Sequence, residues 1–570
     1  MKNIEVAKLL YDIADILEIL GEAFKPQAYR KAAKSIENLG DDIEEYYKKG
    51  KLREIPGVGE SISEKIKELL ETGKSSYYEE LKSKIPEGVA NLIEIPGMGP
   101  KKAMYLYKTL SIKSIEELED AAKRGKLRQL KGFGEKSEQD ILKGIEILRR
   151  GQQRFLLGIV LPIVSEIIKN LKTLKEVQNI SVAGSVRRMK ETVGDVDILV
   201  VSKNPKPIMD YFTSMKEVSS VIAKGTTKSS VILKNNMQVD LRVVEEDSFG
   251  SALQYFTGSK EHNIALREIC KKKNLKLSEY GLFNEKNKRI AGKNEEDIYK
   301  KLGMQFIEPE LRENFGEIEY AIKGKLPDLV RYDDIKGDLH IHSKWSDGDD
   351  EIKDIALEAQ RIGYEYIAIS DHSKSQRIAH GLSEEDLEKR NREIDTLRDK
   401  FSIKILKGME VDILPDGSLD YDDKILKKLD VVIISVHSRF KSTKEEMTKR
   451  ILRAMDNPYV NILGHPTGRL ITTRTEYEVD IDKIIEKAKN NNIALEVNAN
   501  PNRLDLRDVY VKRAVNSGAK MVIGTDAHSK INLNFMQFGI GTARRGWAEK
   551  KDIINTMRYK ELKEFLYKKT

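Results

Sequence analysis

Histidine is distributed very unevenly along this chain of 570 residues. Only His262 precedes residue 340, and the other seven histidines lie in the last two-fifths of the sequence. In that part, residues 337–570, apolar strand-like runs alternate with amphipathic helices, which is typical of a parallel (β/α) barrel. The carboxyl ends of such strands converge on one mouth, so side chains that follow them would meet there. The sequence therefore predicts a barrel with a metal site at its mouth.

Nine side chains that can bind a metal come at or just after these strand-like runs. Motifs such as Asp-Leu-His-Ile-His and Gly-Thr-Asp-Ala-His place two side chains on one side of a strand. The nine are His340, His342, Asp347, His372, Glu410, His437, His465, Asp526 and His528. So many nitrogen and oxygen ligands would hold two or three ions, of which Mn²⁺ and Zn²⁺ are the expected ones. His380 follows no strand, and we expect it on a loop.

A second candidate metal site begins in residues 184–197, Gly-Ser-Val-Arg-Arg-Met-Lys-Glu-Thr-Val-Gly-Asp-Val-Asp. Short β-branched runs flank this stretch and predict two strands joined by a Gly-Ser turn. Asp195 and Asp197 would point to one face of the second strand, where Mg²⁺ would relieve their repulsion. Asp240, in the alternating strand Val-Asp-Leu-Arg-Val, supplies a third carboxylate. Without that third carboxylate, a surface hairpin with a charged turn would explain the stretch as well.

One motif occurs three times in residues 1–150, a region whose apolar spacing predicts helices throughout. The copies are Leu-Arg-Glu-Ile-Pro-Gly-Val-Gly, Leu-Ile-Glu-Ile-Pro-Gly-Met-Gly and Leu-Arg-Gln-Leu-Lys-Gly-Phe-Gly. Their glycines are Gly57, Gly59, Gly97, Gly99, Gly132 and Gly134. Gly-x-Gly between two helices leaves backbone N–H groups bare for a phosphate, although any single copy could be a plain turn.

The three copies resemble the helix–hairpin–helix motif. This resemblance implies a grip on the DNA backbone that does not read its sequence. It also implies that hairpin carbonyls bind a monovalent cation. The matching carbonyls are those of Ile55, Val58, Ile93, Ile95 and Met98.

Length and composition limit the possible classes of protein. A chain of 570 residues should form about three to five domains. No apolar run approaches the length of a membrane span and the N-terminus has no signal-peptide pattern, so we expect a cytoplasmic protein without a membrane partner. The single cysteine, Cys270, excludes an internal disulfide and is expected to be buried. The net charge of +8 is spread along the chain, so a nucleic-acid partner must be argued from local motifs.

The Gly-x-Gly repeats and the Gly-Ser turn with its three carboxylates make residues 1–318 resemble the family X DNA polymerases, the DNA polymerase beta type. The resemblance implies that Asp195 and Asp197 bridge two Mg²⁺ ions, and that Asp240 binds the ion that activates the primer 3′-hydroxyl. It also implies contacts with a deoxynucleoside triphosphate, because the segment Tyr-Phe-Thr-Gly-Ser matches the family's sugar-facing segment. The implied nucleotide-binding residues are Gly184, Ser185, Arg188, Gly194, Tyr255, Phe256, Gly258 and Asn263. Lys260 stands where some relatives carry Asp, and Arg187 receives no role.

The first helical segment, with Tyr-Arg-Lys-Ala-Ala at residues 29–33, resembles the small N-terminal domain of the same family. In some relatives that domain removes a 5′-deoxyribose phosphate through a Schiff-base lysine, and Lys65 lies at the matching position. A second lysine of the family's pocket is Ser61 here. Lys65 is therefore either a lyase nucleophile or an ordinary helix lysine that touches phosphate.

The histidine-rich set resembles the polymerase and histidinol phosphatase (PHP) domain, with all nine ligand positions present. The chemistry implied is metal-assisted attack of water on a phosphorus ester. Fused to a polymerase, such a domain implies a 3′→5′ exonuclease, 3′-end cleaning or abasic-site cleavage.

The expected architecture is multidomain α/β, with a helical helix–hairpin–helix region, a nucleotidyltransferase α+β palm and a distorted (β/α) barrel. The expected boundaries are 1–75 and 76–150 for two helical parts, 151–250 for the palm, 251–318 for a nucleotide-side subdomain, 319–336 for a linker and 337–570 for the PHP domain. The expected protein is a monomeric DNA-repair polymerase that fills gaps in primed DNA and trims 3′ ends.

Two other functions fit parts of the sequence. A nucleotidyltransferase for RNA or a small molecule, joined to a phosphatase, would use the same two metal sites, but the three hairpins and Tyr255-Phe256 argue against it. A DNA-binding scaffold without catalysis would not need either set of ligands.

Overall fold

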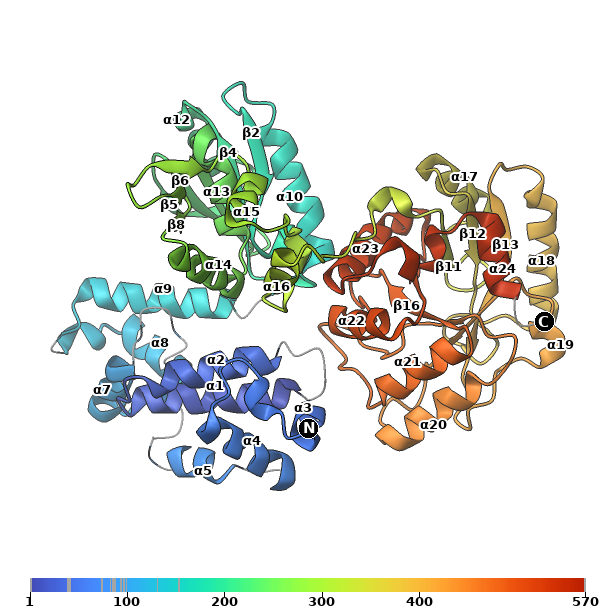
Figure 1. Ribbon diagram of the computed structural model, residues 1–570, viewed down its shortest axis with the longest axis horizontal. Coiled ribbons are helices and arrows are strands. Elements are labelled where there is room, and N and C mark those ends of the chain that lie inside the picture. Colours follow the sequence, from blue (N-terminus) through green and yellow to red (C-terminus); the bar gives the residue numbers. More distant parts are fainter. Residues whose placement is uncertain are drawn as a thin grey trace. The chain divides into compact units, whose positions relative to one another are not determined.

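The computed structural model describes residues 3–37, 43–72, 75–82, 84, 89–92, 95, 98, 100–130, 132–151 and 154–567 (Figure 1). Contacts divide the chain into two compact units, residues 1–154 and 155–570. No helix among the described residues is both long and apolar enough to cross a membrane.

The first unit is helical in its described parts. Its helices are α1 (Asn3–Ile19), α2 (Lys25–Glu37), α3 (Ile43–Lys48), α4 (Glu60–Thr72), α5 (Ser76–Lys82), α6 (Val89–Leu92), α7 (Pro100–Leu110), α8 (Ile115–Lys123) and α9 (Glu135–Gly151), with 3₁₀ turns at Leu52–Glu54 and Leu127–Gln129. One apolar core lies within residues 6–81 and another within residues 89–145. The helical prediction is confirmed for these residues.

The second unit begins with a domain built on a five-stranded sheet. Its elements are β1 (Phe155–Leu156), α10 (Leu157–Leu171), β2 (Asn179–Val182), α11 (Gly184–Arg187), β3 (Thr192–Val193), β4 (Asp195–Val201), α12 (Pro205–Thr213), β5 (Val218–Lys224), β6 (Lys228–Leu233) and β7 (Gln238–Val244). The strand order is β2-β4-β7-β6-β5, and only the central pair β4 and β7 is parallel. Alternating apolar residues of β4 and β7 pack on the core beneath the sheet.

A smaller domain follows, with a three-stranded sheet and its own core around the buried Tyr299. Its elements are α13 (Phe249–Thr257), α14 (Lys260–Lys272), β8 (Lys276–Ser278), β9 (Gly281–Phe283), β10 (Arg289–Ala291), α15 (Glu295–Leu302), a 3₁₀ turn η4 (Pro309–Leu311) and α16 (Glu317–Ile322). Cys270 is buried in this core, as expected.

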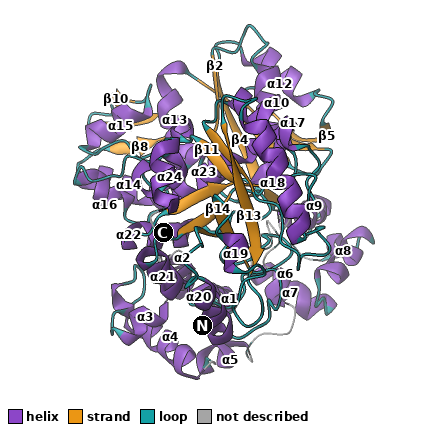
Figure 2. Cartoon of the chain, turned by 90° about the vertical axis from the view of Figure 1, so that its right-hand side faces the viewer, coloured by secondary structure: helices purple, strands orange, loops and turns teal. Residues whose placement is uncertain are grey.

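Seven parallel strands form the barrel of the last part, in the sequential order β11 to β17. The strands are β11 (Gly337–Ile341), β12 (Tyr366–Ile369), β13 (Lys404–Asp412), β14 (Val431–Ser435), β15 (Ile462–Leu463), β16 (Ala494–Asn498) and β17 (Met521–Gly524). The helices are α17 (Ile352–Ile362), α18 (Glu384–Arg398), α19 (Asp423–Leu426), α20 (Lys444–Ala454), α21 (Ile481–Asn490), α22 (Asp508–Ser517), α23 (Met536–Arg545) and α24 (Tyr559–Tyr567). A parallel bridge between Ile341 and Ala527 nearly closes the barrel, and Figure 2 shows its strands enclosed by helices. The predicted fold class is confirmed.

The barrel packs against both preceding domains through helix α23. Gly541 of α23 approaches Met189 so closely that an added Cβ would lie 2.8 Å from the Met189 side chain. The predicted linker, residues 319–336, begins inside α16 and then lies against the barrel, where the Val330 N–H donates to the carbonyl of Ala548 (2.9 Å). The second unit is therefore held together by buried contacts between its domains.

Candidate active sites

The three carboxylates of the five-stranded domain lie on its two parallel strands. In the register of β4 and β7, Asp197 is paired with Asp240. Asp195 lies two residues before Asp197 and shares its face of the sheet. The structure thus brings together the three acidic residues that the sequence singled out.

The electrostatics of this trio favour a bound cation. Burial, followed by the charges of Asp195 and Asp240, raises the pKa of Asp197 to about 7. The Lys228 ammonium lies 3.0 Å from Asp240 Oδ2, and the Gln238 amide donates to Asp240 Oδ1 (3.0 Å). Clustered carboxylate oxygens of this kind fit Mg²⁺, which takes oxygen ligands and relieves the repulsion between them. Sequence reasoning missed Lys228, because nothing in its own segment marks it.

The turn before these carboxylates is a single helical turn, α11. Gly184 has a φ of +62°, and a Cβ there would meet Asp197 Oδ2 at 2.9 Å, so only glycine fits. Ser185 lies within α11, and Gly194 directly precedes Asp195. Arg188 ends the turn, donating to the Thr257 carbonyl and placing Nε 3.0 Å from Glu313 Oε1.

The segment expected to face the sugar ends helix α13. The Tyr255 and Phe256 rings meet edge to face with centroids 5.1 Å apart, and the Arg242 guanidinium lies over the Phe256 ring at 4.5 Å. Gly258 follows, with Arg188 beside it. The Asn263 amide donates to the Tyr255 carbonyl (2.7 Å), so Asn263 fixes the backbone of this segment.

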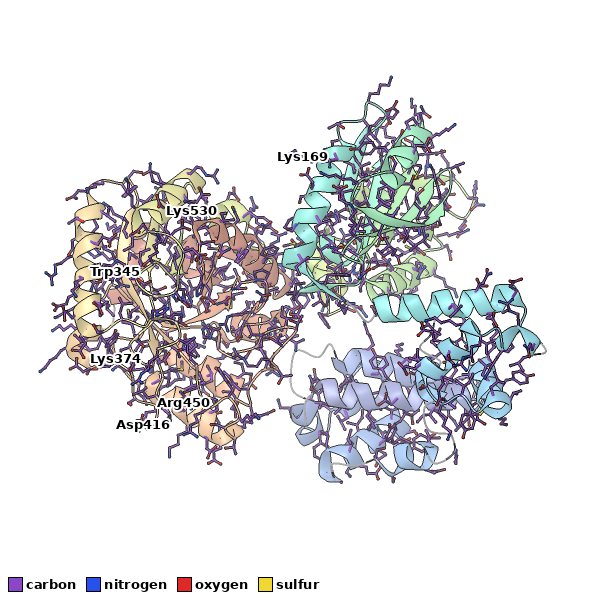
Figure 3. All side chains as sticks on the ribbon, turned by 180° about the vertical axis from the view of Figure 1, so that it is seen from behind. Lys169, Trp345, Lys374, Asp416, Arg450 and Lys530 are labelled. Carbon is purple, nitrogen blue, oxygen red and sulfur yellow. The ribbon has the colours of Figure 1, made fainter. Side chains whose placement is uncertain are left out.

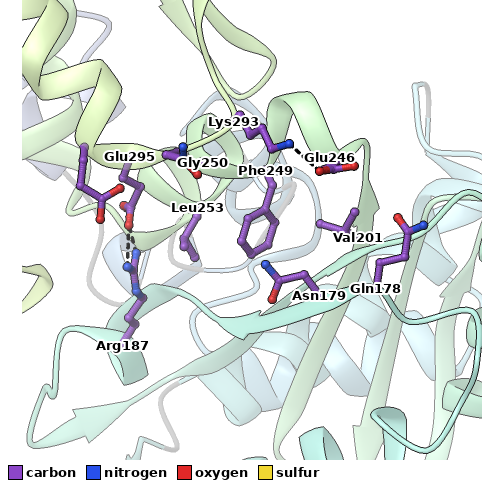
Figure 4. A pocket seen from close by; sticks show the side chains of 12 residues that line it. Gln178, Asn179, Arg187, Val201, Glu246, Phe249, Gly250, Leu253, Lys293 and Glu295 are labelled. Carbon is purple, nitrogen blue, oxygen red and sulfur yellow. Dashed lines mark hydrogen bonds and ion pairs between the residues drawn. The ribbon is translucent and has the colours of Figure 1, made fainter.

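Arg187, which the sequence left without a role, has a structural one. It donates to both carboxylate oxygens of Glu295 (3.0 and 2.5 Å) and to the Thr257 hydroxyl (2.8 Å). Glu295 also accepts from the fully buried Arg312 (2.6 Å). Arg187 and Glu295 lie at the edge of a cavity of about 560 Å³ beside Phe249 (Figure 4). This network fixes the smaller domain on the five-stranded one.

The hairpins of the helical unit share one backbone pattern. The N–H of the residue between the two glycines donates to a carbonyl three residues earlier, at 2.8–3.0 Å: Val58 to Ile55, Met98 to Ile95 and Phe133 to Leu130. Gly57 and Gly132 have φ of +85° and +88°, as a tight turn requires. Gly59 and Gly134 directly precede α4 and α9 and have open space where a side chain would be. Gly97, Gly99 and Ile93 lie outside the described residues.

Lys65 lies on α4 in a small polar and aromatic cluster. Its ammonium donates to the Ser61 hydroxyl (2.9 Å) and carbonyl (3.1 Å) and lies 4.5 Å from the centroid of the Tyr77 ring. Partial burial lowers the pKa of Lys65, which Glu68 opposes and Lys25 reinforces. A lysine in this setting is easier to deprotonate than an exposed one.

The nine predicted ligands of the barrel converge on one mouth, and they come from six of its strands and the loops that follow. They form three overlapping groups in which the ligand atoms lie within 4.8 Å of one another. The groups are His342 with Asp347, His372 and His528; His340 with His342 and Asp526; and His372 with Glu410 and His437. His465 joins them, because its Nε2 lies 2.9 Å from Glu410 Oε1.

Glu410 is the centre of this mouth and is fully buried. Its oxygens lie 2.9 Å from His372 Nδ1, 3.4 Å from His437 Nε2 and 3.5 Å from His340 Nε2. Burial by itself would raise the pKa of Glu410, but the cationic forms of these histidines lower it well below the usual value. A carboxylate surrounded by several imidazoles is a set of donors that suits Mn²⁺ or Zn²⁺.

Two carboxylates that sequence reasoning missed contact the Nδ1 atoms of two of the histidines. Glu496 Oε1 lies 2.6 Å from His340 Nδ1, and Asp412 Oδ1 lies 2.6 Å from His437 Nδ1. These contacts direct the other nitrogen, Nε2, toward the cluster, as is usual for metal-binding histidines. Both acids lie on apolar strands, so the strand-end rule that found the ligands could also have found them.

The cluster contains buried polar atoms that make no hydrogen bond within the protein. They are His340 Nε2, both ring nitrogens of His342, His372 Nδ1, His465 Nδ1 and Glu410 Oε2, each without a hydrogen bond. Unsatisfied buried donors and acceptors are costly, and bound metal ions would satisfy these. The residues present therefore fit a cluster of two or three ions.

Basic and aromatic residues also follow the strands of the barrel. Trp345, Lys374 and Lys530, labelled in Figure 3, lie in the segments after β11, β12 and β17. Arg503 Nε lies 3.2 Å from Asp526 Oδ2, and its NH1 is buried without a partner. His380 lies on an exposed loop outside the three groups, as expected.

Five family models match the chain in sequence order. They are a helix-hairpin-helix domain (residues 1–75), a tandem of helix-hairpin-helix motifs (89–146), the DNA polymerase beta palm (160–262), the DNA polymerase beta thumb (252–313) and the PHP domain (338–500). The three carboxylates lie within the palm match, and seven of the nine barrel residues lie within the PHP match, which ends before Asp526 and His528.

Curated relatives match the whole chain or part of it. The DNA polymerase/3′-5′ exonuclease PolX of Bacillus subtilis (strain 168) is 40% identical over 571 residues, 99% of each chain. A probable phosphatase of Thermoanaerobacter sp. (strain X514) is 30% identical over 230 residues, which is 38% of this chain and 88% of the relative. A probable phosphatase of Clostridium acetobutylicum is 31% identical over 181 residues, 30% of this chain and 69% of the relative.

Proposed function

The chain belongs to the family X DNA polymerases that carry a PHP domain, and from this membership we propose a DNA-repair enzyme that fills short gaps and trims 3′ ends. It is a DNA-directed DNA polymerase with a 3′→5′ exonuclease in one chain. The observation that carries the proposal is two separate sets of candidate metal ligands, one on β4 and β7 within the palm match and one at the mouth of the barrel, largely within the PHP match. The proposed boundaries between domains are those expected from the sequence.

For nucleotidyl transfer, Asp195, Asp197 and Asp240 would hold two Mg²⁺ ions. When bound, these ions supply Lewis acidity at the 3′-hydroxyl and at the triphosphate. Asp240 can accept the hydroxyl proton, and the bare N–H groups at the start of α11, with Ser185 and Arg188, can bind the β- and γ-phosphates. Tyr255, Phe256 and Gly258 would face the sugar, with Asn263 toward the base edge.

For the nuclease, the nine ligands of the barrel would hold two or three Mn²⁺ or Zn²⁺ ions. When bound, these ions supply the Lewis acidity that makes water a nucleophile toward a phosphodiester. Glu496 and Asp412 keep His340 and His437 oriented, and the free NH1 of Arg503 can donate to a phosphate oxygen next to Asp526. The same chemistry would serve 3′-end cleaning and abasic-site cleavage.

The helical unit would hold the DNA. Three Gly-x-Gly hairpins with one backbone pattern can bind phosphates on both sides of a gap, and their carbonyls can bind a monovalent cation. Lys65 is a proposed lyase nucleophile. Its partial burial lowers the pKa of its ammonium group, and only the neutral amine can form a Schiff base. Borohydride trapping on DNA with a 5′-deoxyribose phosphate tests this role, and Lys67, an exposed lysine of the same helix, provides the control.

A second candidate activity for the barrel is that of a phosphomonoesterase. The partial relatives are probable phosphatases, and one of them matches over a length close to that of the barrel. A primer that ends in a 3′-phosphate separates the candidates. Release of phosphate before any nucleotide indicates end cleaning, and release of nucleotides from a 3′-hydroxyl end indicates an exonuclease.

The central test uses DNA with a one-nucleotide gap and wild-type, D240A and H340A proteins. We expect D240A to lose incorporation and keep nuclease, and H340A to do the reverse. Each assay is run with Mg²⁺, Mn²⁺ or Zn²⁺. A single substitution that abolished both activities in a folded protein would disprove two separate sites.

A further inference from the structure

A buried group of charges joins the barrel to the phosphate-binding turn of the polymerase domain. Arg545, the last residue of α23, places its NH1 3.0 Å from Glu313 Oε1. The same Glu313 oxygen lies 3.0 Å from Arg188 Nε. One carboxylate is therefore shared by an arginine of the barrel and an arginine of the turn, although 232 residues separate Glu313 from Arg545.

Arg545 is fixed on both of its sides. Its NH1 also donates to the Arg188 carbonyl (3.0 Å), and its NH2 donates to Asp508 Oδ2 of α22 (2.6 Å). Only 4% of its side chain is exposed. Together with the close approach of Gly541 to Met189, these contacts hold the backbone of the turn at Arg188 against α23. A side chain anchored in this way can set the position of the residue it touches.

The shared carboxylate also tunes the charge that Arg188 presents. With Arg545 present, the negative charge of Glu313 is divided between two guanidinium groups and the nearby Lys190 (3.7 Å). Without Arg545, Glu313 would pair with Arg188 and Lys190 alone, and a bound triphosphate would have to compete with a stronger ion pair. The turn would also lose the donor to the Arg188 carbonyl.

We propose that Arg545 is a positioning residue of the polymerase site, by which the barrel holds Arg188 ready for the triphosphate of the incoming nucleotide. The inference rests on the proposed role of Arg188 in binding that triphosphate. It goes beyond that role, because a residue of the nuclease domain then sets nucleotide affinity in the polymerase. The polymerase site would thus extend across two domains with different chemistry.

The test is single-nucleotide insertion into gapped DNA by the full-length R545A and R545K proteins. We expect R545A to raise the KM for the deoxynucleotide about tenfold with kcat little changed, since the interaction lost serves binding. R545K, which keeps the charge, should recover part of that loss. The double variant R545A/E313Q should also recover part of it, because it removes the carboxylate that would hold Arg188.

The neighbouring Arg544 provides a matched control. It lies on the same helix and pairs with Glu310 of η4 (2.7 Å) and with the Val330 carbonyl (3.0 Å), and no contact of it involves Arg188 or Glu313. R544A should loosen the same interface yet leave the KM for the nucleotide unchanged. Exonuclease activity and the thermal midpoint, measured on each protein, show that the variants remain folded.

The possible outcomes separate this inference from the function on which it rests. If R188A raises KM but R545A does not, or if R544A raises KM as much as R545A, the positioning role of Arg545 is refuted and the proposed function stands. If R188A leaves KM unchanged, Arg188 does not bind the triphosphate, and the inference is refuted together with that assignment. A raised KM in R188A and R545A, with R544A unchanged, supports it.

Discussion

The two candidate catalytic sites present their proposed metal ligands in opposite ways. The polymerase site has three carboxylates on two adjacent strands, and one of them, Asp195, is exposed. The barrel offers nine proposed ligands from six strands and the loops that follow, and the central members His340, His342 and Glu410 are at most 1% exposed. Among the described residues, the groups of ligand atoms lying within 4.8 Å of one another are all in the barrel.

This difference teaches how each site should use its metals. Mg²⁺ keeps several waters and is commonly held by one or two carboxylates together with substrate phosphates. The polymerase site would accordingly be completed by the nucleotide. The barrel supplies enough nitrogen and oxygen ligands to bind its ions before any substrate arrives. We therefore expect resident metals in the barrel and transient ones in the polymerase.

The largest expected effect comes from removing the central ligand of each site. E410Q should lower nuclease activity more than about 100-fold. That figure is the upper end of the loss caused by mutating a residue that only supports a ligand, whereas Glu410 itself contacts members of all three groups of proposed ligands. It should also lower the metal content of the purified protein, measured by elemental analysis. D197N should abolish primer extension with the metal content unchanged. Equal metal loss in both variants would contradict the contrast between resident and transient ions.

A smaller effect is expected on stability. Free Mn²⁺ at 100 times its dissociation constant should stabilise the folded protein by about 2.7 kcal/mol, since the unfolded chain has no assembled site. Thermal unfolding without nucleotide measures this shift. H342A should remove it, and D195N, which removes a negative charge at the polymerase site, should keep it. A shift that D195N removes would place a resident ion in the polymerase instead.

The proposed ligands could be singled out from the sequence, because each lies on a strand or soon after one along the chain. The three polymerase carboxylates were found in the same way, from the spacing of Asp195 and Asp197 and a strand that carries Asp240. The barrel followed from the alternation of strands and helices, and the palm from the resemblance to the family X polymerases. Strands, helices and the residues at strand ends depend on neighbouring residues in the chain, so the spacing of apolar residues predicts them.

What the sequence did not provide depends on contacts between distant segments. Glu496 lies 156 residues from His340, and its strand contains no histidine to mark it. Arg187 received no role, because its partner Glu295 lies 108 residues away on another domain. The link from Arg545 to Glu313 is of the same kind. A spacing rule can mark such residues as candidates, but the partner that each one meets is set by how distant segments pack.

Glu496 offers a finer test of the preorganised barrel. E496Q keeps the shape of the side chain but weakens its hold on His340 Nδ1, so metal affinity should fall about 10- to 100-fold. The concentration of Mn²⁺ that gives half-maximal nuclease activity measures this change. Primer extension by the same protein is the internal control and should be unaffected. Unchanged Mn²⁺ dependence would mean that the cluster itself orients His340.

The smallest expected effect concerns the DNA that the hairpins are proposed to hold for both sites. G132D would place a carboxylate where a phosphate is expected to bind, and repulsion of ~1 kcal/mol in water should weaken DNA binding about fivefold. Both activities should then fall by the same factor at low DNA concentration and recover when DNA is saturating.

G21D is the matched control, because Gly21 has a similar φ (+84° against +88°) and equally open space but lies outside the hairpins. Both substitutions carry the same backbone strain, so a difference between them reports the hairpin alone. If G132D lowered primer extension and left the nuclease unchanged, the hairpins would serve the polymerase only, and the barrel would have to bind DNA by its own mouth.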